Sequence, residues 1–377
     1  GIDELAVLYI EDTDFIKNRI LTRKYAKSLS QLNKTDKAIL TLEKFIESSS
    51  IIDREVSFEL LMLYLKEERL DYAIPLIEKL IGIDPSDDDF IFRIALSCFD
   101  NERYNLSEKY FNILLSKFYA PDNINFFLGQ IDYKNKRYDE ALLHYQRIQQ
   151  GTFVNTKALN VSKAILKKHN LEKALTYIDN EIKIKNQNNL LNSLSLKLSI
   201  FEEVGESAKI ISLSSQILQT FPNNERALYS RALAYEKEGN ILNMSKDFDE
   251  MIKLNKYNSI ALNAYGYSLA LHKLHLNKSE KLIRKALSIQ PGQAAILDSL
   301  AWVLYLKGSY KEAAKYSSLA YSKDQDPEIV EHHYLILLKN GNSEEAKHIL
   351  DQSIKNNPNS EKLLKLLDNS KNAAINL

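Results

Sequence analysis

The side chains that could act as acids, bases or nucleophiles are scattered along this chain of 377 residues. His272 and His275 lie three residues apart, but lysines flank them and no carboxylate stands beside them. His332 and His333 are adjacent, so they point to different faces of any helix that holds them. No His-Glu-x-x-His run is present, and the one cysteine, Cys98, excludes a disulfide framework and a cysteine-based zinc site. We therefore expect neither an enzyme nor a bound metal or cofactor.

Glycine is too sparse to build a nucleotide-binding loop. The ten glycines lie far apart, and the closest two are Gly292 and Gly308, whereas such loops need glycines within a few residues of each other. Fifty Lys and Arg balance fifty Asp and Glu, which removes the excess of positive charge expected of a general nucleic-acid binder. No run of 18 apolar residues occurs, so no membrane-spanning helix is expected.

Aromatic side chains recur at regular spacing and are candidates for binding another protein. Phe58, Phe92 and Phe126 are each 34 residues apart. Exposed together, they would form an apolar patch larger than a monomer normally leaves bare, suited to an apolar peptide or a partner helix. The alternative is that the rings pack between neighbouring helices as additional core. Three further residues extend this candidate stripe, namely Met62, Phe99 and Tyr133.

A second candidate set combines aromatic rings with polar side chains. Aromatic rings with polar tips beside asparagine and aspartate are the usual makeup of a protein-binding hot spot. Here too the alternative is core packing between helices. The single tryptophan of the chain belongs to this set, which comprises Tyr229, Asn263, Tyr267, Asp298, Trp302 and Tyr305.

Both sets follow from a longer repeat that runs through most of the sequence. The phrase DKAILTLEKFI has the pattern Ala-x3-large-x2-large. Counterparts of its small residue recur at spacings of 33 to 36 residues, a regularity that predicts a repeat architecture. Ten such positions are found, at Ala38, Ala73, Ser107, Ala141, Ala174, Ala208, Met244, Ser279, Ala313 and Ala346.

Each copy contains two amphipathic stretches with apolar residues at i, i+3, i+4 and i+7, which indicates a pair of helices. In the first copy, Ala26 and Leu29 share a face of the first stretch, and Ala38 and Leu42 share a face of the second. Small residues let the two helices of a pair cross closely, and larger ones fill the space to the next pair. Glycine and proline are scarce, which favours helices joined by short loops.

Numbered within a unit of about 34 residues, this pattern resembles the tetratricopeptide repeat. The resemblance implies an all-α fold, a right-handed superhelical solenoid of about ten helix pairs with capping helices at both ends. We expect one continuous array over residues 1–377, with an N-terminal cap at 1–18, about ten repeats at 19–358 and a C-terminal cap helix and tail at 359–377. No copy has the tryptophan usual at position 4, and Met244 replaces a small residue at position 20.

Such a superhelix usually works through its concave face, to which positions 2, 5, 9 and 12 of each first helix contribute. The candidate residues named above fall at positions 5, 9 and 12 of their repeats. The resemblance therefore implies a non-enzymatic scaffold that binds a partner protein or peptide in a groove.

The last third of the chain resembles a narrower group, the bacterial tetratricopeptide proteins often found as outer-membrane lipoproteins. The matching residues are ALNAYGYSLA (261–270), KLIRKALSIQPGQAAILDSLAWVLY (281–305) and DPEIVEHHYLILLKNGNSEEAKHIL (326–350). One branch of this group is the adaptor of a periplasmic carboxyl-terminal processing protease. That resemblance implies a scaffold that binds and activates the protease and presents cell-wall hydrolases to it. The lipid-bearing cysteine would lie upstream of Gly1, so that a lipid anchor alone would hold the protein to the membrane, facing the periplasm.

Other interpretations stay open. Helical repeats of a related design bind RNA through a basic groove with a base-reading residue pair in every repeat. That hypothesis rests mainly on a group of lysines, and because position 5 varies in character along the array we expect no nucleic-acid partner. A scaffold that assembles with copies of itself is a further alternative, as is a cytoplasmic location. The lysines are Lys157, Lys163, Lys167, Lys168 and Lys173.

Overall fold

A computed structural model describes residues 18–32, 34–49 and 52–375 of the protein. Every regular element in these residues is an α-helix, 21 in number, which confirms the all-α prediction. The predicted N-terminal cap at 1–18 lies outside the described residues except for Asn18, whose Oδ1 accepts hydrogen bonds from the N–H groups of Ile20 and Leu21. Within the described ranges, no helix combines the length and the apolar character needed to traverse a bilayer.

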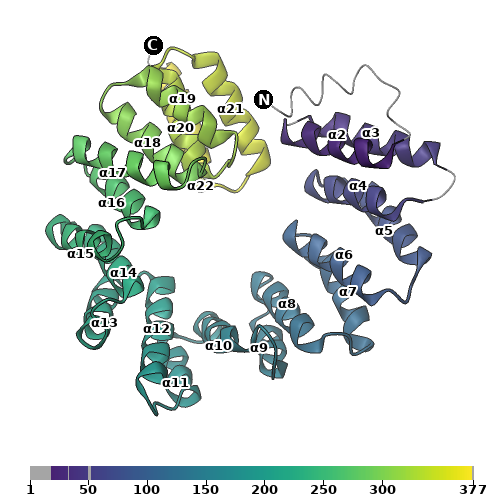
Figure 1. The fold of residues 1–377 in the computed structure, drawn as a ribbon, viewed down its shortest axis with the longest axis horizontal. Coiled ribbons are helices and arrows are strands. Elements are labelled where there is room, and N and C mark those ends of the chain that lie inside the picture. The colour runs from purple at the N-terminus through teal and green to yellow at the C-terminus, as the bar shows by residue number, and fades with distance from the viewer. Residues whose placement is uncertain (1–17, 33, 50–51, 376–377) are drawn as a thin grey trace. The chain divides into compact units, whose positions relative to one another are not determined.

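Contacts among the helices divide the chain into two compact units, residues 1–183 (unit 1) and residues 184–377 (unit 2). Helices α2–α11 belong to unit 1 and α12–α22 to unit 2 (Figure 1). The two units are described separately below. One unbroken array over residues 1–377 stays a prediction.

The described part of unit 1 consists of five consecutive helix pairs. In each pair an even-numbered first helix is followed, after a turn of two or three residues, by an odd-numbered second helix. The pairs are α2 (Arg19–Gln31) with α3 (Thr35–Ser48), α4 (Arg54–Lys66) with α5 (Leu70–Ile83), α6 (Asp88–Asp100) with α7 (Tyr104–Ser116), α8 (Pro121–Lys134) with α9 (Tyr138–Arg147), and α10 (Val154–Lys168) with α11 (Leu171–Glu181).

Unit 2 repeats the arrangement five times and then adds one helix. Ten pairs in the described chain agree with the predicted number of repeats. The elements are α12 (Gln187–Val204) with α13 (Ser207–Thr220), α14 (Glu225–Lys237) with α15 (Ile241–Leu254), α16 (Ser259–Leu271) with α17 (Leu276–Ile289), α18 (Ala294–Leu306) with α19 (Tyr310–Tyr321), α20 (Pro327–Lys339) with α21 (Ser343–Asn356), and finally α22 (Glu361–Ile375).

The small residues that define the repeat lie where the two helices of a pair cross. Nine of the ten are fully buried, as the sequence predicts. In two pairs the small residue is a serine whose Oγ donates a hydrogen bond to a carbonyl of the first helix. Ser107 donates to the oxygen of Ala95 at 2.9 Å, and Ser279 donates to that of Gly266 at 2.6 Å. A Cβ built on Gly266 would lie only 2.5 Å from Cγ1 of Ile283, so the crossing leaves no room for a side chain there.

The exception is Ala208, which is exposed, whereas its neighbour Ser207 is buried. The preceding helix α12 has 18 residues, while the other first helices have 13 to 15. The repeat therefore shifts by one residue in this pair, and the register assigned from the sequence is wrong there. Asn192, which is exposed, takes position 5 in place of the buried Ser193.

Helix α22 lies where the sequence predicts the C-terminal cap. Its Leu363 and Leu366 are buried in one apolar cluster with Val330 and Leu337 of α20. The terminal helix thus covers apolar surface of the last pair that would otherwise face water, which is the role of a cap in a repeat protein.

Candidate functional site

The candidate stripe of unit 1 is less open than expected. Phe58 is only 6% exposed. Its ring lies 5.7 Å from that of Phe90 on the next first helix, and the guanidinium of Arg93 lies 3.9 Å above its centroid. The expectation that Phe58 faces an open groove is therefore wrong, because α6 covers it.

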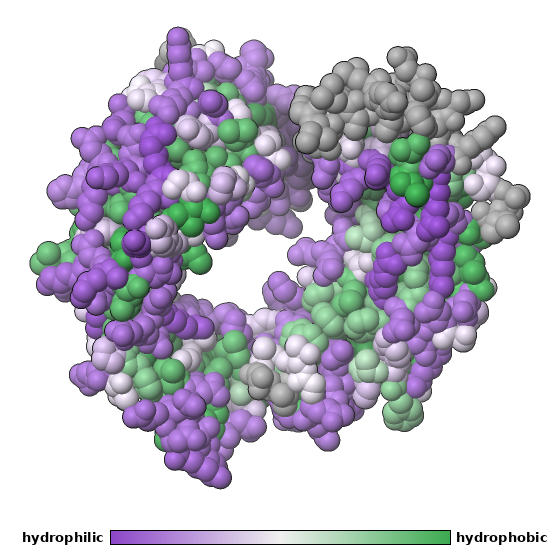
Figure 2. All heavy atoms as spheres, viewed as in Figure 1, coloured by the Kyte–Doolittle hydropathy of each residue, from purple (hydrophilic) through white to green (hydrophobic). Residues whose placement is uncertain are grey.

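Phe92, Phe99 and Phe126 are half-buried and meet around a residue that the sequence analysis did not single out, Phe127. The centroid of Phe127 lies 6.2 Å from that of Phe92 and 5.3 Å from those of Phe99 and Phe126. We call Phe127 and the five phenylalanines whose rings contact it the aromatic cluster, and apolar atoms gather over α6 and α8 at this place (Figure 2). Its members are Phe92, Phe99, Phe111, Phe126, Phe127 and Phe153.

The rings of the aromatic cluster pack mainly against one another. Phe126 stacks on Phe153 with centroids 3.8 Å apart and planes 5° from parallel, and Phe111 stacks on Phe127 at 5.3 Å. Such contacts hold aromatic rings in place and leave limited ring surface for a partner. The cluster therefore fits the core alternative better than the open stripe.

The two other residues of the stripe are also half-buried. Met62 packs on the apolar core of unit 1, and the ring centroid of Tyr133 lies 5.6 Å from that of Tyr138. That the stripe binds a partner stays a prediction for each of its residues.

Two cavities open along the first helices of unit 2. The larger has a volume of about 550 Å³ and the smaller about 300 Å³. Tyr229 and Leu233 of α14 line both, so the two cavities lie on either side of these side chains. We refer to the two together as the groove.

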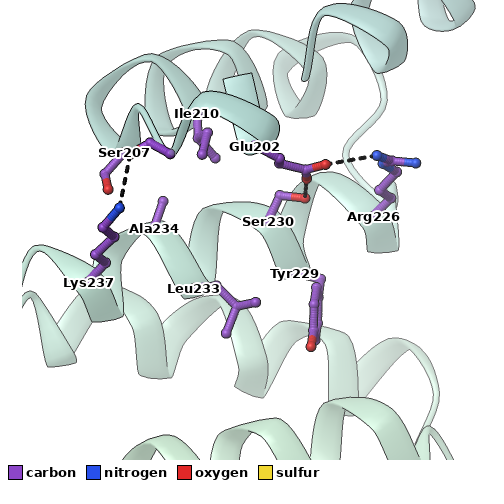
Figure 3. Close-up of a pocket in the computed structure, with 10 residues that line it drawn as sticks. Glu202, Ser207, Ile210, Arg226, Tyr229, Ser230, Leu233, Ala234 and Lys237 are labelled. Atoms are coloured by element: carbon purple, nitrogen blue, oxygen red, sulfur yellow. Dashed lines mark hydrogen bonds and ion pairs between the residues drawn. The ribbon is translucent and has the colours of Figure 1, made fainter. Parts of the chain in front are cut away.

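The larger cavity lies between α12, α13 and α14, and its charged groups are paired (Figure 3). The Glu202 carboxylate accepts hydrogen bonds from Ser230 Oγ at 2.5 Å and from Arg226 Nη2 at 3.0 Å. Lys237 Nζ donates to the carbonyl oxygen of Gly205 at 3.0 Å. Figure 3 shows Ser230 pointing toward α12, while Tyr229 projects from another side of α14.

The smaller cavity lies between α14, α16 and the start of α18. Its walls include Leu233 and Ile260, which are 36% and 63% exposed. Asn263 lines it as well, and the Oδ1 atom of Asn263 is buried without a hydrogen-bond partner. Burial raises the pKa of Tyr229, another residue of the wall, so its hydroxyl stays protonated near neutral pH. The remaining polar residues of the wall are Ser259, Tyr267, Gln290 and Gln293.

The rest of the second candidate set is tied into a network on three first helices. The Tyr267 hydroxyl of α16 donates a hydrogen bond to Glu328 Oε1 of α20 at 2.6 Å. Asp298 of α18 is 5% exposed, and its Oδ2 lies 2.8 Å from His332 Nδ1 of α20. Burial raises the pKa of Asp298 in spite of this contact, and its other oxygen, Oδ1, has no partner.

Trp302 belongs to the same network. Its ring stacks on that of His332 with centroids 4.1 Å apart, and on that of Tyr305 at 5.0 Å. The contact with His332 connects α18 to α20, and both contacts engage the tryptophan within the protein. In the second set, Tyr229 and Asn263 line the groove, and Asp298 and Trp302 contact His332. Tyr305 stacks on Trp302, and Tyr267 belongs to both groups.

Sequence reasoning missed the apolar wall of the groove. Leu233 and Ile260 occupy positions 9 and 2 of their repeats, the same register that selected the candidate residues. That register was therefore a sufficient signal to find them. The network residue His332 could not be found in this way, because its partner Asp298 comes from a different repeat.

Two of the histidines contact polar groups of neighbouring helices. His272 Nε2 lies 2.8 Å from Glu236 Oε1, a carboxylate that the preceding first helix supplies. His333 Nδ1 lies 2.8 Å from Ser317 Oγ, but both residues are buried beyond the reach of a substrate. Among the described residues, no group of three or more His, Cys, Asp or Glu side chains is disposed to hold a metal ion.

Comparison with known proteins connects these helix pairs to a family. Residues 92–153 match the family model of the tetratricopeptide repeat. A TPR repeat-containing protein of Pseudomonas aeruginosa is 26% identical over 211 residues, which are 56% of this chain and 36% of that protein. The match thus spans about a third of the length of that relative.

Two solved structures are similar at low identity. A tetratricopeptide repeat protein from Parabacteroides merdae is 16% identical, covers 66% of this chain and 98% of its own, and has a TM-score of 0.48. PilW, a widely conserved type IV pilus biogenesis factor, is 18% identical, covers 58% of this chain and 100% of its own, and has a TM-score of 0.47. Similarity at this level says nothing about what this chain binds.

The family match covers α7, α8 and α9 together with most of α6, and the other described pairs repeat the same arrangement of small and large residues. Residues 92–153 thus match the tetratricopeptide repeat, and the chain as a whole is an array of helix pairs of that kind.

Proposed function

We propose that this protein is a non-enzymatic scaffold that binds a segment of a partner protein in the groove of unit 2. Tetratricopeptide repeats in general mediate contacts between proteins. The observation that carries the proposal is the pair of cavities on either side of Tyr229 and Leu233, on the face of the first helices where positions 2, 5 and 9 lie. Clefts of this volume with mainly apolar walls and a few polar groups are the usual form of a binding site.

Exposed apolar side chains in the groove support this proposal. Leu233 and Ile260 leave much of their surface in water, although a solvated leucine or isoleucine gains free energy on burial. A partner side chain in the smaller cavity would cover both. Amide and hydroxyl groups of Asn263, Gln290 and Gln293 stand beside them to orient the partner.

We further propose that the partner is a carboxyl-terminal processing protease of the bacterial periplasm, to which the scaffold presents cell-wall hydrolases. This finer proposal rests on the resemblance of residues 261–270, 281–305 and 326–350 to lipoprotein adaptors of that kind. The resembling segments include Asn263, Tyr267 and Ile296, which line the smaller cavity. On this proposal the protein faces the periplasm from the outer membrane.

Affinity capture with matched variants tests both levels. The intact chain, a groove variant and a control variant are each used as bait in extracts of bacterial envelope and of cytosol. The groove variant carries Leu233→Glu and Ile260→Glu. The control carries Leu242→Glu and Leu319→Glu, which introduce the same charges at exposed leucines of second helices in the same unit.

We expect the intact chain and the control to retain a processing protease and cell-wall hydrolases, and the groove variant to lose them. Equal capture by all three baits would show that the groove is not the binding surface. Capture of partners from cytosol alone would contradict the proposal of a periplasmic adaptor but would agree with that of a protein-binding scaffold. Circular dichroism of the three baits shows whether each variant keeps its helices.

A further inference from the structure

The smaller cavity has the dimensions and the walls of a pocket for one long side chain. Its volume of about 300 Å³ is at the lower end of the range for ligand pockets. Leu233, Ile260 and Ile296 provide an apolar wall from three successive first helices. Ala264 and Ala295 keep the space between those helices open. An unbranched aliphatic stem fits such a wall.

Unpaired hydrogen-bond acceptors lie at and behind the wall of this pocket. Asn263 Oδ1 is buried and has no partner, although Asn263 lines the cavity. Asp298, at the same repeat position of the next first helix, is nine-tenths buried and has an unpaired Oδ1 as well. A buried acceptor without a donor is unfavourable, so Asn263, which lines the cavity, favours a ligand rich in N–H groups over one that brings further acceptors.

The residues that line the pocket carry no charge, and carboxylates lie near one of them. None of the residues that line it is a lysine or an arginine. Burial raises the pKa of the Tyr267 hydroxyl in the pocket wall, and the nearby carboxylates of Glu328, Asp298 and Glu331 raise it further. Among the described residues Glu331 is paired with Lys362, while Glu328 has only the Tyr267 hydroxyl. The field therefore favours a cation.

From these observations we propose that the smaller cavity binds a lysine or arginine side chain of the partner segment. The methylene stem lies along Leu233, Ile260 and Ile296, and the Asn263 amide turns toward the cavity so that Oδ1, which is buried without a ligand, accepts hydrogen bonds from the charged end. The rings of Tyr229 and Tyr267 stand in the same wall and provide further attraction for the cation. This inference rests on the proposed function and states which side chain of the partner enters the groove.

Methyl nuclear magnetic resonance of the intact chain tests the inference with small probes. The probes are the N-acetyl amides of arginine, lysine, norleucine and glutamate, and the signal is the δ1-methyl group of Ile260, assigned with an Ile260→Val variant. We expect saturable shifts with arginine and lysine, weaker binding as the salt concentration rises, and at least tenfold weaker binding of norleucine and glutamate.

A matched pair of variants shows whether the acceptor matters. Asn263→Leu removes Oδ1 at nearly constant volume and should weaken binding of the arginine probe by about tenfold or more. Gln352→Leu makes a similar change on the exposed face of α21 and should leave the binding unchanged. Equal affinity for norleucine, preference for glutamate, or no effect of Asn263→Leu would overturn the inference.

The inference and the proposed function fail in different ways. If Leu233→Glu with Ile260→Glu abolishes partner capture while Asn263→Leu leaves both capture and probe binding unchanged, the groove binds the partner without a basic anchor. If the arginine probe binds in the smaller cavity but the groove variant captures the same partners as the intact chain, the pocket exists and the partner binds elsewhere.

Discussion

Phe127 of unit 1 and Ala264 of unit 2 occupy the same place in their repeats, one residue after position 5 of a first helix. Around Phe127 the neighbouring rings of Phe99 and Phe126 lie 5.3 Å away, and the space between the helices is filled. Beside Ala264 the space is an open cavity of about 300 Å³. Helix pairs of the same design thus enclose a filled core in one unit and leave an open cavity in the other. The difference depends on the size of the side chain at this position and of its neighbours.

The largest effect on stability should come from a substitution in the aromatic cluster of unit 1. Phe127→Ala removes a ring that touches five others, and we expect the loss of packing to cost about 3 kcal/mol of unfolding free energy. Urea unfolding followed by circular dichroism measures it. Phe118→Ala is the matched control, since Phe118 is 84% exposed and its loss should change stability by less than about 0.5 kcal/mol. Equal effects of the two variants would contradict the closed-core interpretation.

A second prediction concerns pH, since the aromatic cluster of unit 1 has no titratable group whereas the core of unit 2 contains His333. Burial lowers the pKa of His333 from 6.5 to about 4, and nearby Glu345 offsets this only in part. Below pH 6.5 the unfolded chain takes up a proton that the folded chain does not bind until about pH 4. Stability should therefore fall through this window, by about 3 kcal/mol in total.

Fluorescence of Trp302, the single tryptophan, follows urea unfolding of unit 2 across this range. His333→Gln should remove most of the decrease between pH 6.5 and pH 4. His169→Gln, at an exposed histidine of unit 1, should leave it in place. A decrease of the same size in His333→Gln would show that another group causes it.

A third prediction compares helix crossings in the two units. Gly129 and Gly266 both lie at position 8, and a Cβ at either would come within 2.5 Å of another atom. At Gly129 the obstacle is the ring of Tyr145, but at Gly266 it includes the backbone oxygen of Ser279 at 2.9 Å, which cannot rotate away. Gly266→Ala should therefore cost about 2 kcal/mol and more than Gly129→Ala.

Gly82 provides the control for these substitutions, because nothing lies within 4 Å of a Cβ at that position of α5. Gly82→Ala should raise the unfolding free energy by about 0.5 kcal/mol through helix propensity. Urea unfolding of the three variants measures the order of their unfolding free energies. A Gly266→Ala variant as stable as the intact chain would mean that the helices cross less closely than the structure shows.

The smallest effect on stability should come from filling the smaller cavity of unit 2. Ala264→Phe places a ring in the smaller cavity, as Phe127 does in unit 1, and we expect the unfolding free energy to change by no more than about 1 kcal/mol. Binding of the arginine probe should be lost. Ala208→Phe adds the same ring to an exposed face of α13 and should leave the probe binding intact. Retained binding in Ala264→Phe would place the probe elsewhere.

Much of the fold could be predicted from local pattern, because burial within a helix pair follows the helical period. The fully buried Ala38, Ala73 and Ala346 were identified in this way. The shift at Ser207 could not be, since the spacing alone does not show that α12 is longer than the other first helices.

The candidate site was predicted less well, because it depends on neighbours from other repeats. Phe58 is covered by Phe90 and Arg93, which come from the following first helix. Asn263 and Tyr229, which the sequence places at position 5, line the smaller cavity, but whether a cavity exists beside them depends on small residues such as Ala264. The period of the sequence pattern shows on which helix face a residue lies. It does not show whether side chains of neighbouring repeats fill the space beside that face.

The hydrogen bond from Tyr267 to Glu328 has a consequence for how this part of the chain unfolds. It joins α16 to α20, which are not successive first helices, while Asp298 and Trp302 of α18 contact His332 of the same α20. A repeat protein whose helices interact only with their nearest neighbours frays one pair at a time from its end. Here α16, α18 and α20 share one network, so α20 cannot detach without breaking contacts with both other helices. The C-terminal repeats should therefore open as one cooperative block, with hydrogen exchange of their buried amides proceeding at a common rate.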